Sequence, residues 1–462
     1  MNAQQLLQEI SDYCRRTGLA ESTFGRRAVN DGKLTARLRN GGRITTDTLD
    51  RIHGFMAAHS AHSDRPAIIE RTREGRASAP PPSPALAKAG DPQRNFRFFD
   101  NRQKYLLFVN TCSEKWEVAH RVSEELAHIH PRPPAVRVFD AGVGDGTVLV
   151  RVMRAMHDRF PHMPFYMVGK EISLEDIRLT LQKMSDRFFE HPATVLVLTN
   201  LAYADAPWLA VKSINAASSL VWHELPLIGN SAHQFEKQII SLEPFLGENW
   251  KATVSARTGN PIYERPVVLV LYREDHRFML DQNIPRPGGT QANYDLVIAS
   301  QPYRARAPLE FKAKRVIAPL AKALGPGGRL VAIHSHGHDP GMEIIQKVWP
   351  DDHPFIHDRH QILKAVKHEL GPAGRDLNFN AYADNRALFR YVMHTLPSEI
   401  SESIGTSTLF AAWNAAIYVA QVEDDRLAEV GDRYIDATRS VLRERGGLWF
   451  FDESYVISRR RQ

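Results

Sequence analysis

The chain has 462 residues, of which 43% are hydrophobic, and its formal net charge is +6. This length predicts two or three compact units, and the hydrophobic share is ordinary for a globular protein. No stretch approaches the roughly 20 uninterrupted apolar residues of a membrane helix, and the polar N-terminus is unlike a secretory signal. The two cysteines, Cys14 and Cys112, favour reduced thiols. We therefore expect a cytoplasmic protein with no membrane partner, and the mild positive charge permits a nucleic-acid partner.

Residues 1 to 60 predict a small all-helical domain with four short helices. The third spans Lys33 to Arg39, and its basic residues Lys33, Arg37 and Arg39 face outward. The order of helix, short helix, basic short helix and helix resembles a lambda-repressor-like helix-turn-helix unit. The resemblance implies that these three basic residues contact DNA in the major groove. The alternative is a helical docking module whose basic face is solvated.

Residues 61 to 95 include a proline-rich run, 79–84, and contain little apolar material. They cannot bury a core, so we expect a flexible linker. Residues 96 to 462 then predict one larger domain. Its first helices, up to about Ala127, either close over a bound cofactor or pack against the edge of a sheet.

A glycine-rich run follows the first apolar strand of this domain. The strand, Val136 to Phe139, leads into Asp140-Ala141-Gly142-Val143-Gly144-Asp145-Gly146, and a helical pattern begins at Thr147. Glycine is needed where the backbone takes positive φ or where a ligand lies against it. Such a turn between a strand and a helix is typical of a nucleotide-type binding loop in an open α/β sheet. Its spacing is neither the dinucleotide fingerprint nor a P-loop.

The pattern D-x-G-x-G-x-G resembles motif I of class I S-adenosylmethionine (SAM)-dependent methyltransferases. The resemblance implies an α/β fold, a Rossmann-like doubly wound seven-stranded sheet, with SAM as cofactor. The acidic residue that ends the second strand, Phe165 to Gly169, would bind the ribose, and polar residues after the third strand would lie near the adenine. The cofactor contacts predicted at the ends of these three strands are Asp140, Gly142, Gly144, Gly146, Glu171, Asn200 and Asp205.

Two apolar runs compete for the fourth strand, Leu220 to Leu225 and Tyr294 to Ala299. We prefer the second, because a helical pattern, a Pro-Gly-Gly turn and a further strand follow it directly. Residues from about 206 to 290 are then a large insert of unknown role. Within it, Lys251 to Ala256 and Val267 to Tyr272 predict a hairpin joined through a Gly-Asn-Pro turn.

Past residue 340, three helices are predicted, around Ile344 to Val348, Ile362 to Leu370 and Leu388 to Met393. Strand-like runs at Tyr418 to Val422 and Leu448 to Ile457 predict the closing antiparallel pair of the sheet. A helix between Leu427 and Leu442 separates these two runs.

Ser300-Gln301-Pro302-Tyr303 follows the preferred fourth strand. It resembles the Asn/Asp/Ser-Pro-Pro-Tyr/Phe turn of methyltransferases that act on exocyclic or amide nitrogens. The resemblance implies that Ser300 accepts a hydrogen bond from an NH₂ group and that Tyr303 stacks on a planar acceptor. Gln301 replaces the first proline, so specificity for a planar nitrogen stays open. The alternative is a plain turn with a buried tyrosine.

Three histidines, His334, His336 and His338, follow the fifth strand at the edge where ligands bind in open α/β folds. We expect His334 and His336 to line the substrate mouth, where one of them acts as a base near neutral pH. Alternation could place His334 and His338 on one side for a metal, but neither an H-E-x-x-H pattern nor a nearby cysteine supports one. No metal is assigned.

Together these features predict a SAM-dependent methyltransferase whose catalytic groups are Ser300, Tyr303, His334 and His336. A nucleic-acid acceptor would unite the helical domain with the Ser300–Tyr303 turn, and its base would be flipped out or single-stranded. A small-molecule acceptor would leave the helical domain with a docking or regulatory role and make the insert a lid. A SAM-sensing DNA-binding regulator without turnover, and transfer of the aminocarboxypropyl group, are the other hypotheses. The sequence does not predict the oligomeric state.

Overall fold

The computed structural model of the chain describes residues 3–17, 21–29, 31, 33–39, 45–60, 102–255, 261–288, 290–400 and 403–461. The chain forms two compact units, one up to Leu86 and one from Ala87 onward. The predicted linker, residues 61 to 95, lies outside the described residues. No helix in the described ranges is long and apolar enough to span a bilayer.

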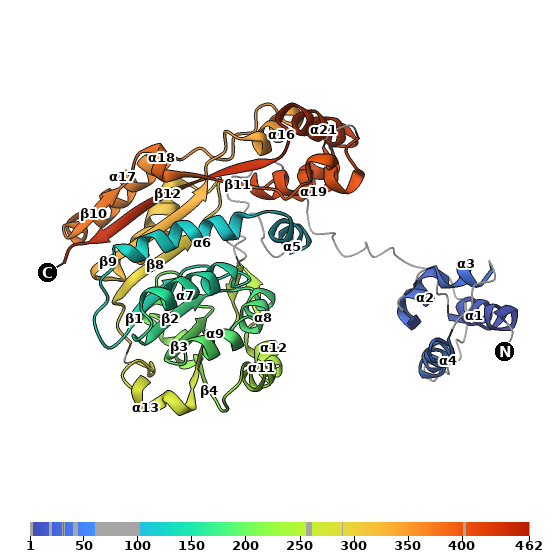
Figure 1. The fold of residues 1–462 in the computed structure, drawn as a ribbon, viewed down its shortest axis with the longest axis horizontal. Helices are drawn as coiled ribbons and strands as arrows, with labels where there is room; N and C mark the ends of the chain where they lie inside the picture. Colours follow the sequence, from blue (N-terminus) through green and yellow to red (C-terminus); the bar gives the residue numbers. More distant parts are fainter. Residues whose placement is uncertain are drawn as a thin grey trace, which may run out of the picture. The chain divides into compact units, whose positions relative to one another are not determined.

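The described part of the N-terminal unit contains four helices (Figure 1): α1 (Ala3–Thr17), α2 (Glu21–Val29), α3 (Leu34–Arg39) and α4 (Thr46–Ser60). Their apolar faces meet in one small core, where the rings of Tyr13 and Phe24 pack edge to face with centroids 5.4 Å apart. The third helix begins at Leu34, one residue later than predicted. Lys33 therefore precedes it, while Arg37 and Arg39 lie within it.

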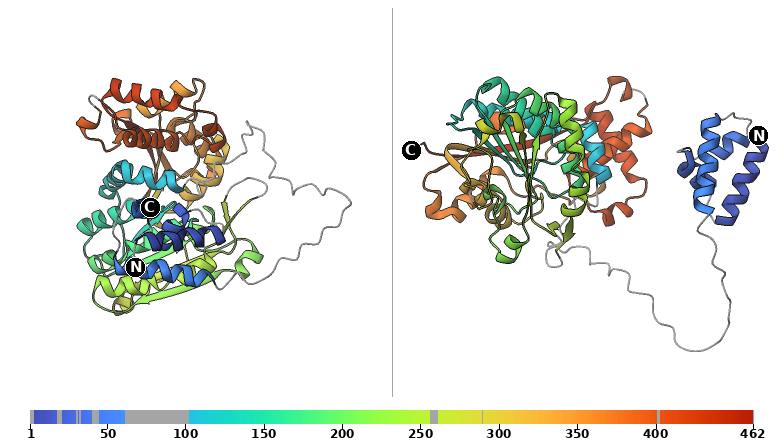
Figure 2. Two further views of the ribbon diagram at one scale, coloured as in Figure 1. Left: turned by 90° about the vertical axis from the view of Figure 1, so that its right-hand side faces the viewer. Right: turned by 90° about the horizontal axis from the view of Figure 1, so that it is seen from below.

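The larger unit is built on a ten-stranded sheet with helices on both faces (Figures 1 and 2). The strands run in the order β10-β12-β9-β8-β1-β2-β3-β7-β4, and β11 pairs with β12. A separate two-stranded sheet holds β5 and β6. The strands are β1 (Val136–Asp140), β2 (Phe165–Lys170), β3 (Thr194–Thr199), β4 (Val221–Leu227), β5 (Ala252–Val254), β6 (Pro261–Tyr263), β7 (Val267–Arg273), β8 (Tyr294–Ser300), β9 (Leu324–Ser335), β10 (Leu377–Asn380), β11 (Leu388–Val392) and β12 (Trp449–Arg459).

The central strands β3, β2, β1, β8 and β9 are parallel, and β12 lies antiparallel between β9 and β10. From β1 the chain moves outward through β2 and β3 in one direction and later through β8 and β9 in the other. This is a Rossmann-like, doubly wound sheet, as predicted, and β8 is its fourth parallel strand. The sheet has ten strands rather than the predicted seven, because β4, β7 and β11 extend it.

The helices of the larger unit form three groups by the core that they share. One group covers the first face of the sheet: α6 (Glu114–Glu124), α7 (Thr147–Arg159), α8 (Leu174–Gln182), α9 (Ser185–Glu190), α11 (Ala232–Ile240) and α12 (Glu243–Asn249). The opposite face is covered by the π-helix η5 (Lys312–Ile317), α15 (Ala318–Lys322) and α17 (Arg359–Leu370). The third group packs beside β11 and β12: α5 (Arg102–Thr111), α16 (Pro340–Val348), α19 (Thr406–Val419) and α21 (Arg433–Arg445). Short helices complete the set: α10 (Ile214–Ser218), α13 (Arg277–Leu280), α14 (Leu309–Phe311), α18 (Asp384–Ala387) and α20 (Asp424–Ala428).

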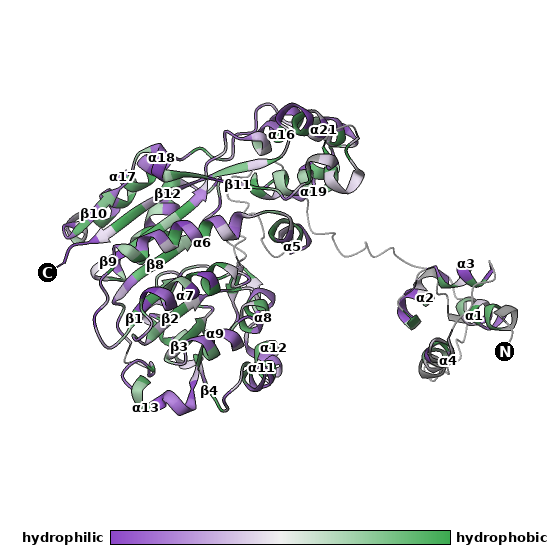
Figure 3. Ribbon diagram, viewed as in Figure 1, coloured by the Kyte–Doolittle hydropathy of each residue, from purple (hydrophilic) through white to green (hydrophobic). Residues whose placement is uncertain are grey.

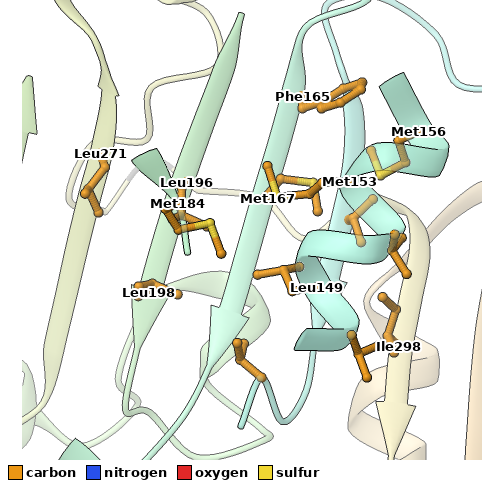
Figure 4. Packing of buried hydrophobic residues seen from close by; sticks show 14 of the residues in the cluster. Leu149, Met153, Met156, Phe165, Met167, Met184, Leu196, Leu198, Leu271 and Ile298 are labelled. Carbon is orange, nitrogen blue, oxygen red and sulfur yellow. The ribbon is translucent and has the colours of Figure 1, made fainter. Parts of the chain in front are cut away.

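The two faces of the sheet bury alternate side chains of the same strands. In β1, Val138 enters one core and Phe139 enters the other, which is why the parallel strands read as continuous apolar runs. Figure 4 shows Leu149 and Met153 of α7 lying over Met167 of β2 on one face. In Figure 3 the inner strands are mostly hydrophobic, whereas hydrophilic residues lie on the outer helix surfaces. Truncating a side chain buried in this way to alanine typically costs about 2–5 kcal/mol.

The prediction of a hairpin between Lys251–Ala256 and Val267–Tyr272 is wrong. Val267–Arg273 forms β7, which lies in the main sheet between β3 and β4, antiparallel to the first and parallel to the second. The partner of β5 is instead β6, and the residues that join these two strands lie largely outside the described ranges. Every residue of β7 is buried, whereas β5 is largely exposed. Burying both faces of an apolar strand requires a position inside a covered sheet, which the small β5–β6 sheet does not offer.

Two elements near the C-terminus also differ from expectation. The predicted helix at Leu388 to Met393 is strand β11, which pairs with β12. The strand-like run at Tyr418 to Val422 begins in the last turn of α19, a helix buried on nearly all sides. Short apolar runs do not distinguish a buried strand from a buried helix end, so tertiary packing decided both. The closing antiparallel pairs are β12 with β9 and β10.

Candidate active site

The glycine-rich run forms a loop at the carboxyl end of β1. Gly144 and Gly146 have φ angles of +55° and +79°, a left-handed conformation that glycine adopts without a Cβ clash. Gly142 has no such φ, and the nearest atom to a Cβ added there would be the Ser300 carbonyl oxygen, 3.9 Å away. A Cβ at Gly142 would therefore make an ordinary contact with the turn that ends β8 and would not clash with it.

Asp140 ends β1 directly beneath this loop, and its side chain is almost fully buried. One carboxylate oxygen, Oδ1, accepts a hydrogen bond from the Gly142 N–H at 3.1 Å. The other, Oδ2, is buried without a hydrogen-bond partner among the described residues. Burial raises the pKa of Asp140 to about 7 against the opposing effect of the Gly142 hydrogen bond. A buried acceptor of this kind is expected to meet a donor or a cation from a bound molecule.

Glu171 follows β2 and turns back toward the glycine loop. Its carboxylate accepts hydrogen bonds from the backbone N–H groups of Gly144 at 2.9 Å, Ile172 at 2.7 Å and Ser173 at 2.9 Å. The predicted ribose acceptor is thus held by three amides of the protein in this structure. It lies next to the loop, as the sequence predicted, but its oxygens face the backbone.

Helix α5 covers the loop through Tyr105, which the sequence analysis did not single out. The Tyr105 hydroxyl accepts a hydrogen bond from the Asp145 N–H at 3.2 Å and lies 3.4 Å from Asp145 Oδ1. Lys183 from the end of α8 contacts the other oxygen of Asp145 at 2.7 Å. Of the two readings left open for this segment, the contact favours a helix that closes over the loop. The sequence signal that could have identified Tyr105 is its hydroxyl, which lies on an otherwise apolar face of the helix.

The two polar residues after β3 have different surroundings. The Asn200 side-chain amide donates to the Arg265 carbonyl at 2.9 Å and accepts from the Val267 N–H at 2.8 Å. It therefore ties the end of β3 to the start of β7. Asp205 has one carboxylate oxygen, Oδ1, that is buried without a hydrogen-bond partner among the described residues, and burial raises its pKa.

The Ser300–Tyr303 turn leaves β8 with a strained backbone. Gln301 has a φ of +46°, which is uncommon for a residue with a side chain. Its amide nitrogen lies 3.2 Å from both Ser335 Oγ and Asp452 Oδ1, and these contacts hold the turn where a proline ring would otherwise do so. The Ser300 hydroxyl is buried without a hydrogen-bond partner among the described residues.

Tyr303 and His334 belong to one buried hydrogen-bond network. The Tyr303 hydroxyl lies 3.0 Å from His334 Nδ1 and 3.2 Å from the Tyr455 hydroxyl. His334 Nε2 lies 2.7 Å from Glu453 Oε1. Glu453 is only 1% exposed, and Arg359 supplies its positive partner, with Nη1 at 3.0 Å from Oε2. Neither Glu453 nor Arg359 was predicted, because the two residues lie 94 positions apart in the chain and no local motif links them.

The other histidines lie at the margin of this network. His336 Nδ1 is 3.8 Å from Glu453 Oε2, and this carboxylate raises the pKa of His336. His338 is exposed and has a φ of +57°. His334 and His338 thus differ in environment, and no group of three or more His, Cys, Asp or Glu side chains in the described residues is arranged to hold a metal ion.

Of the predicted site residues, the carboxyl edge of the sheet brings together the glycine loop, Glu171, Ser300 and the Tyr303–His334 pair. A separate open depression of about 530 Å³ lies at the opposite edge, where β1, β2 and β8 begin, and Arg137 and Asp295 line it. It contains none of the predicted site residues. Lys33, Arg37 and Arg39 belong to the N-terminal unit, where Arg37 pairs with Asp31 at 2.8 Å and Arg39 with Glu21 at 2.6 Å.

No family model matches the chain, and no curated protein is similar to it in sequence. The chain is similar to a structure from Galdieria sulphuraria described as a sarcosine dimethylglycine methyltransferase, with 7% identity, 75% of this chain and 85% of that chain covered, and a TM-score of 0.31. It is also similar to the plantazolicin methyltransferase BpumL with SAH (8% identity, 79% and 93% covered, TM-score 0.29). A third is geranyl diphosphate methyltransferase with SAM (14% identity, 81% and 94% covered, TM-score 0.27). Because the identities and TM-scores are this low, the activity has to be inferred from the chain's own residues and not from these similarities.

The buried network predicts a specific stability defect. Glu453→Gln removes the charge that balances Arg359, so we expect a loss of about 3 kcal/mol in the free energy of unfolding. The loss is no larger because Arg359 keeps a second, exposed partner in Asp384. Urea unfolding at pH 7 measures this loss. The exposed Glu444→Gln is the matched control and should leave stability unchanged. A Glu453→Gln protein as stable as the wild type would contradict the role given to the network.

The same variant has an expected pH signature. Burial alone would raise the pKa of Glu453, but hydrogen bonds from His334 and His336 and the Arg359 partner hold it below its usual value of 4.5. A lowered native pKa contributes stability that is complete above the usual pKa and is lost as the pH falls below it. The unfolding free energy of Glu453→Gln should therefore fall less steeply below about pH 4.5 than that of the wild type.

Proposed function

We propose that the larger unit is a SAM-dependent methyltransferase. The single observation that carries the proposal is the loop at the end of β1. There Gly142, where an added Cβ would meet only the Ser300 carbonyl oxygen at 3.9 Å, adjoins a buried carboxylate oxygen of Asp140 that has no hydrogen-bond partner among the described residues. A cofactor with a cationic amino-acid part supplies the donor that this oxygen lacks, and a side chain at Gly142 would occupy the space of the cofactor.

Four groups would hold the cofactor. Asp140 Oδ2 accepts from the ammonium of its methionine part, and the glycines allow close approach of the loop backbone. Glu171 exchanges its backbone hydrogen bonds for the ribose hydroxyls. Asp205 Oδ1, which also has no hydrogen-bond partner in the part of the chain that the structure describes, accepts from the adenine amino group. Asn200 is left out because both ends of its amide are bonded to the backbone near β7.

The cofactor, when bound, supplies a methyl group on a sulfonium, and the protein has to position the acceptor and remove a proton. Ser300 Oγ, which is buried and has no hydrogen-bond partner within the described ranges, accepts an N–H of a nitrogen acceptor and orients the lone pair of that nitrogen. The Glu453 carboxylate accepts from His334 Nε2–H, so Nδ1 is left to accept the Tyr303 hydroxyl proton. Tyr303 can then take a proton from the acceptor as it passes its own to His334.

Cofactor binding is tested with a variant that spares the fold. Gly142→Val is expected to abolish binding of SAM and S-adenosylhomocysteine by calorimetry while the fold is kept, because Gly142 has no left-handed φ and a Cβ there makes only an ordinary contact with the Ser300 carbonyl oxygen. Gly247→Ala, in α12, where a Cβ meets no described atom within 4 Å, is the control and should bind normally. Undiminished binding by a folded Gly142→Val protein would refute the assignment of the loop.

The acceptor site is tested through Tyr303. Tyr303→Ala should lower the rate of methyl transfer from labelled SAM by at least about tenfold, on the order of 1.4 kcal/mol of transition-state stabilisation, while S-adenosylhomocysteine affinity stays nearly unchanged. Tyr303→Phe separates the two roles of the side chain. It should resemble Tyr303→Ala if the hydroxyl moves a proton, and the wild type if the ring only stacks on the acceptor. Wild-type turnover of Tyr303→Ala would place the acceptor elsewhere.

For the N-terminal unit we propose DNA binding dominated by phosphate contacts from Lys33, Arg37 and Arg39. Both arginines would exchange their present carboxylate partners for phosphates. Replacing all three by alanine in the full chain should reduce the slope of log K against log salt by about 0.9 for each lost contact. The exposed Arg51→Ala is the control in the same unit. If the wild-type chain shifts no duplex DNA at low salt, the unit is instead a protein-docking module.

A further inference from the structure

The open depression at the edge where the parallel strands begin is separate from the site that we assign to methyl transfer. It measures about 530 Å³ and lies at the starts of β1, β2 and β8, whereas the glycine loop and the Ser300–Tyr303 turn lie at the carboxyl ends of these strands. Residues 281–286, which follow α13, also line it. Pockets that hold small molecules measure roughly 300–1,000 Å³, so the depression is large enough for such a ligand.

Two arginines give the depression positive charge. Arg137 is half-buried in β1, and its guanidinium lies over the ring of Tyr166 in β2, with 5.1 Å between Cζ and the ring centre. Arg132 lies in the segment before β1 and is exposed. Neither arginine forms an ion pair with a carboxylate among the described residues, whereas Arg286, which also lines the depression, pairs with Asp281 at 3.1 Å. The charges of Arg132 and Arg137 are therefore available to a bound anion.

The depression also contains acceptors that lack donors. Asp295, at the start of β8, accepts a hydrogen bond from the Arg137 backbone N–H through Oδ2 at 2.8 Å, and its Oδ1 accepts none within the described ranges. Asn283 is only 3% exposed, and its Nδ2 donates to the Pro134 carbonyl at 3.3 Å. Its Oδ1 is buried without a hydrogen-bond partner among the described residues. Burial raises the pKa of Asp295 to about 6, so its carboxylate is mostly ionised at pH 7 and gains from a cationic partner.

The order of the strands separates the two kinds of charge. β1 lies between β8 and β2, so the Asp295 carboxylate comes from one neighbour of β1, while the Arg137 guanidinium lies over the other. Because Asp295 contacts the backbone of Arg137, the two charges are no further apart than the length of one arginine side chain. A ligand with a single charge would leave one of these groups without a partner, and the Asp295 carboxylate would repel a doubly negative ligand. A compact molecule with one positive and one negative group satisfies both.

We propose that this depression binds a free amino acid in its zwitterionic form. Its carboxylate pairs with the Arg137 guanidinium, which can form two parallel hydrogen bonds, and its ammonium donates to the Oδ1 atoms of Asp295 and Asn283. Ile284 and Pro285 line the same depression and offer apolar contact to the side chain of the ligand. Since the depression lies at the opposite edge of the sheet from the glycine loop, the amino acid is a further ligand of the protein and not its methyl acceptor.

The test uses the full-length protein and three conservative variants. Each of the twenty common amino acids is added in turn, and at least one should raise the melting temperature of the wild type and bind at one site per chain by calorimetry. Arg137→Gln and Asp295→Asn each remove one charge, and the new asparagine can still accept the backbone N–H of residue 137. Each should weaken binding at least about tenfold. Arg390→Gln, which removes an exposed arginine over the Trp449 ring in β11, is the matched control and should bind as the wild type does.

Blocked forms of the amino acid that binds best test the two contacts separately. Its amide lacks the carboxylate and its N-acetyl form lacks the ammonium, so each should bind the wild type at least about tenfold more weakly. Equal binding of the blocked forms, unchanged binding by Arg137→Gln, or no binding of any amino acid would overturn the proposal. Binding that Gly142→Val abolishes and Arg137→Gln spares would place the amino acid in the cofactor loop and would also overturn it. None of these measurements needs SAM or turnover, so their failure leaves the proposed methyl transfer standing.

Discussion

A carboxylate that is only 1% exposed must be given positive partners, and the position of Glu453 in β12 makes this the central constraint of the larger unit. The partners come from other elements: Arg359 from the start of α17, and His334 from β9, which in turn holds Tyr303 from the turn after β8. A shift of β12 by one residue would turn Glu453 to the other face and leave Arg359 and His334 buried without it. The need to neutralise the buried charge of Glu453 thus arranges the side of the site that we assign to the acceptor.

Features with a local chemical signal could be predicted from the sequence, and features set by distant partners could not. The glycine loop is recognisable because positive φ at Gly144 and Gly146 demands glycine itself. β8 could be chosen over β4 because a helix and a turn follow it. The direction of the Glu171 carboxylate could not be predicted, since one of its three amide partners, that of Gly144, belongs to a loop 27 residues away. Glu453 likewise lies in a polar run, Asp452-Glu453-Ser454, within an otherwise largely apolar strand, and only the distant Arg359 distinguishes it from its neighbours.

The insert shows how an added strand changes the neighbouring site. β7 lies beside β3 in the sheet, where the predicted fold has an edge, and its start is bonded to both ends of the Asn200 side chain. A residue that the family resemblance would place near the adenine has therefore become part of a strand junction. Of the two residues predicted near the adenine, Asp205 keeps a buried carboxylate oxygen without a hydrogen-bond partner among the described residues. Periodicity within Val267–Arg273 identifies a strand, but its neighbour is fixed only by the buried surface of the whole sheet.

The three hydrogen bonds that Glu171 accepts from backbone amides affect the binding and release of the cofactor that we propose. A charged acceptor that leaves three amides gives up hydrogen bonds worth about 1.5–3 kcal/mol each when nothing replaces them. In the function that we propose, the ribose hydroxyls would therefore replace these hydrogen bonds rather than fill an empty site. The affinity for the cofactor would then reflect the difference between the hydrogen bonds of Glu171 to the ribose and those to the backbone amides. It would be weaker than the contacts of the bound state alone suggest. The reacted and unreacted forms of the cofactor carry the same ribose, so in both cases the ribose hydroxyls compete with the same backbone amides for Glu171. In this proposal Glu171 would return to the backbone amides of the loop as the cofactor leaves, which would favour rapid replacement of one form by the other.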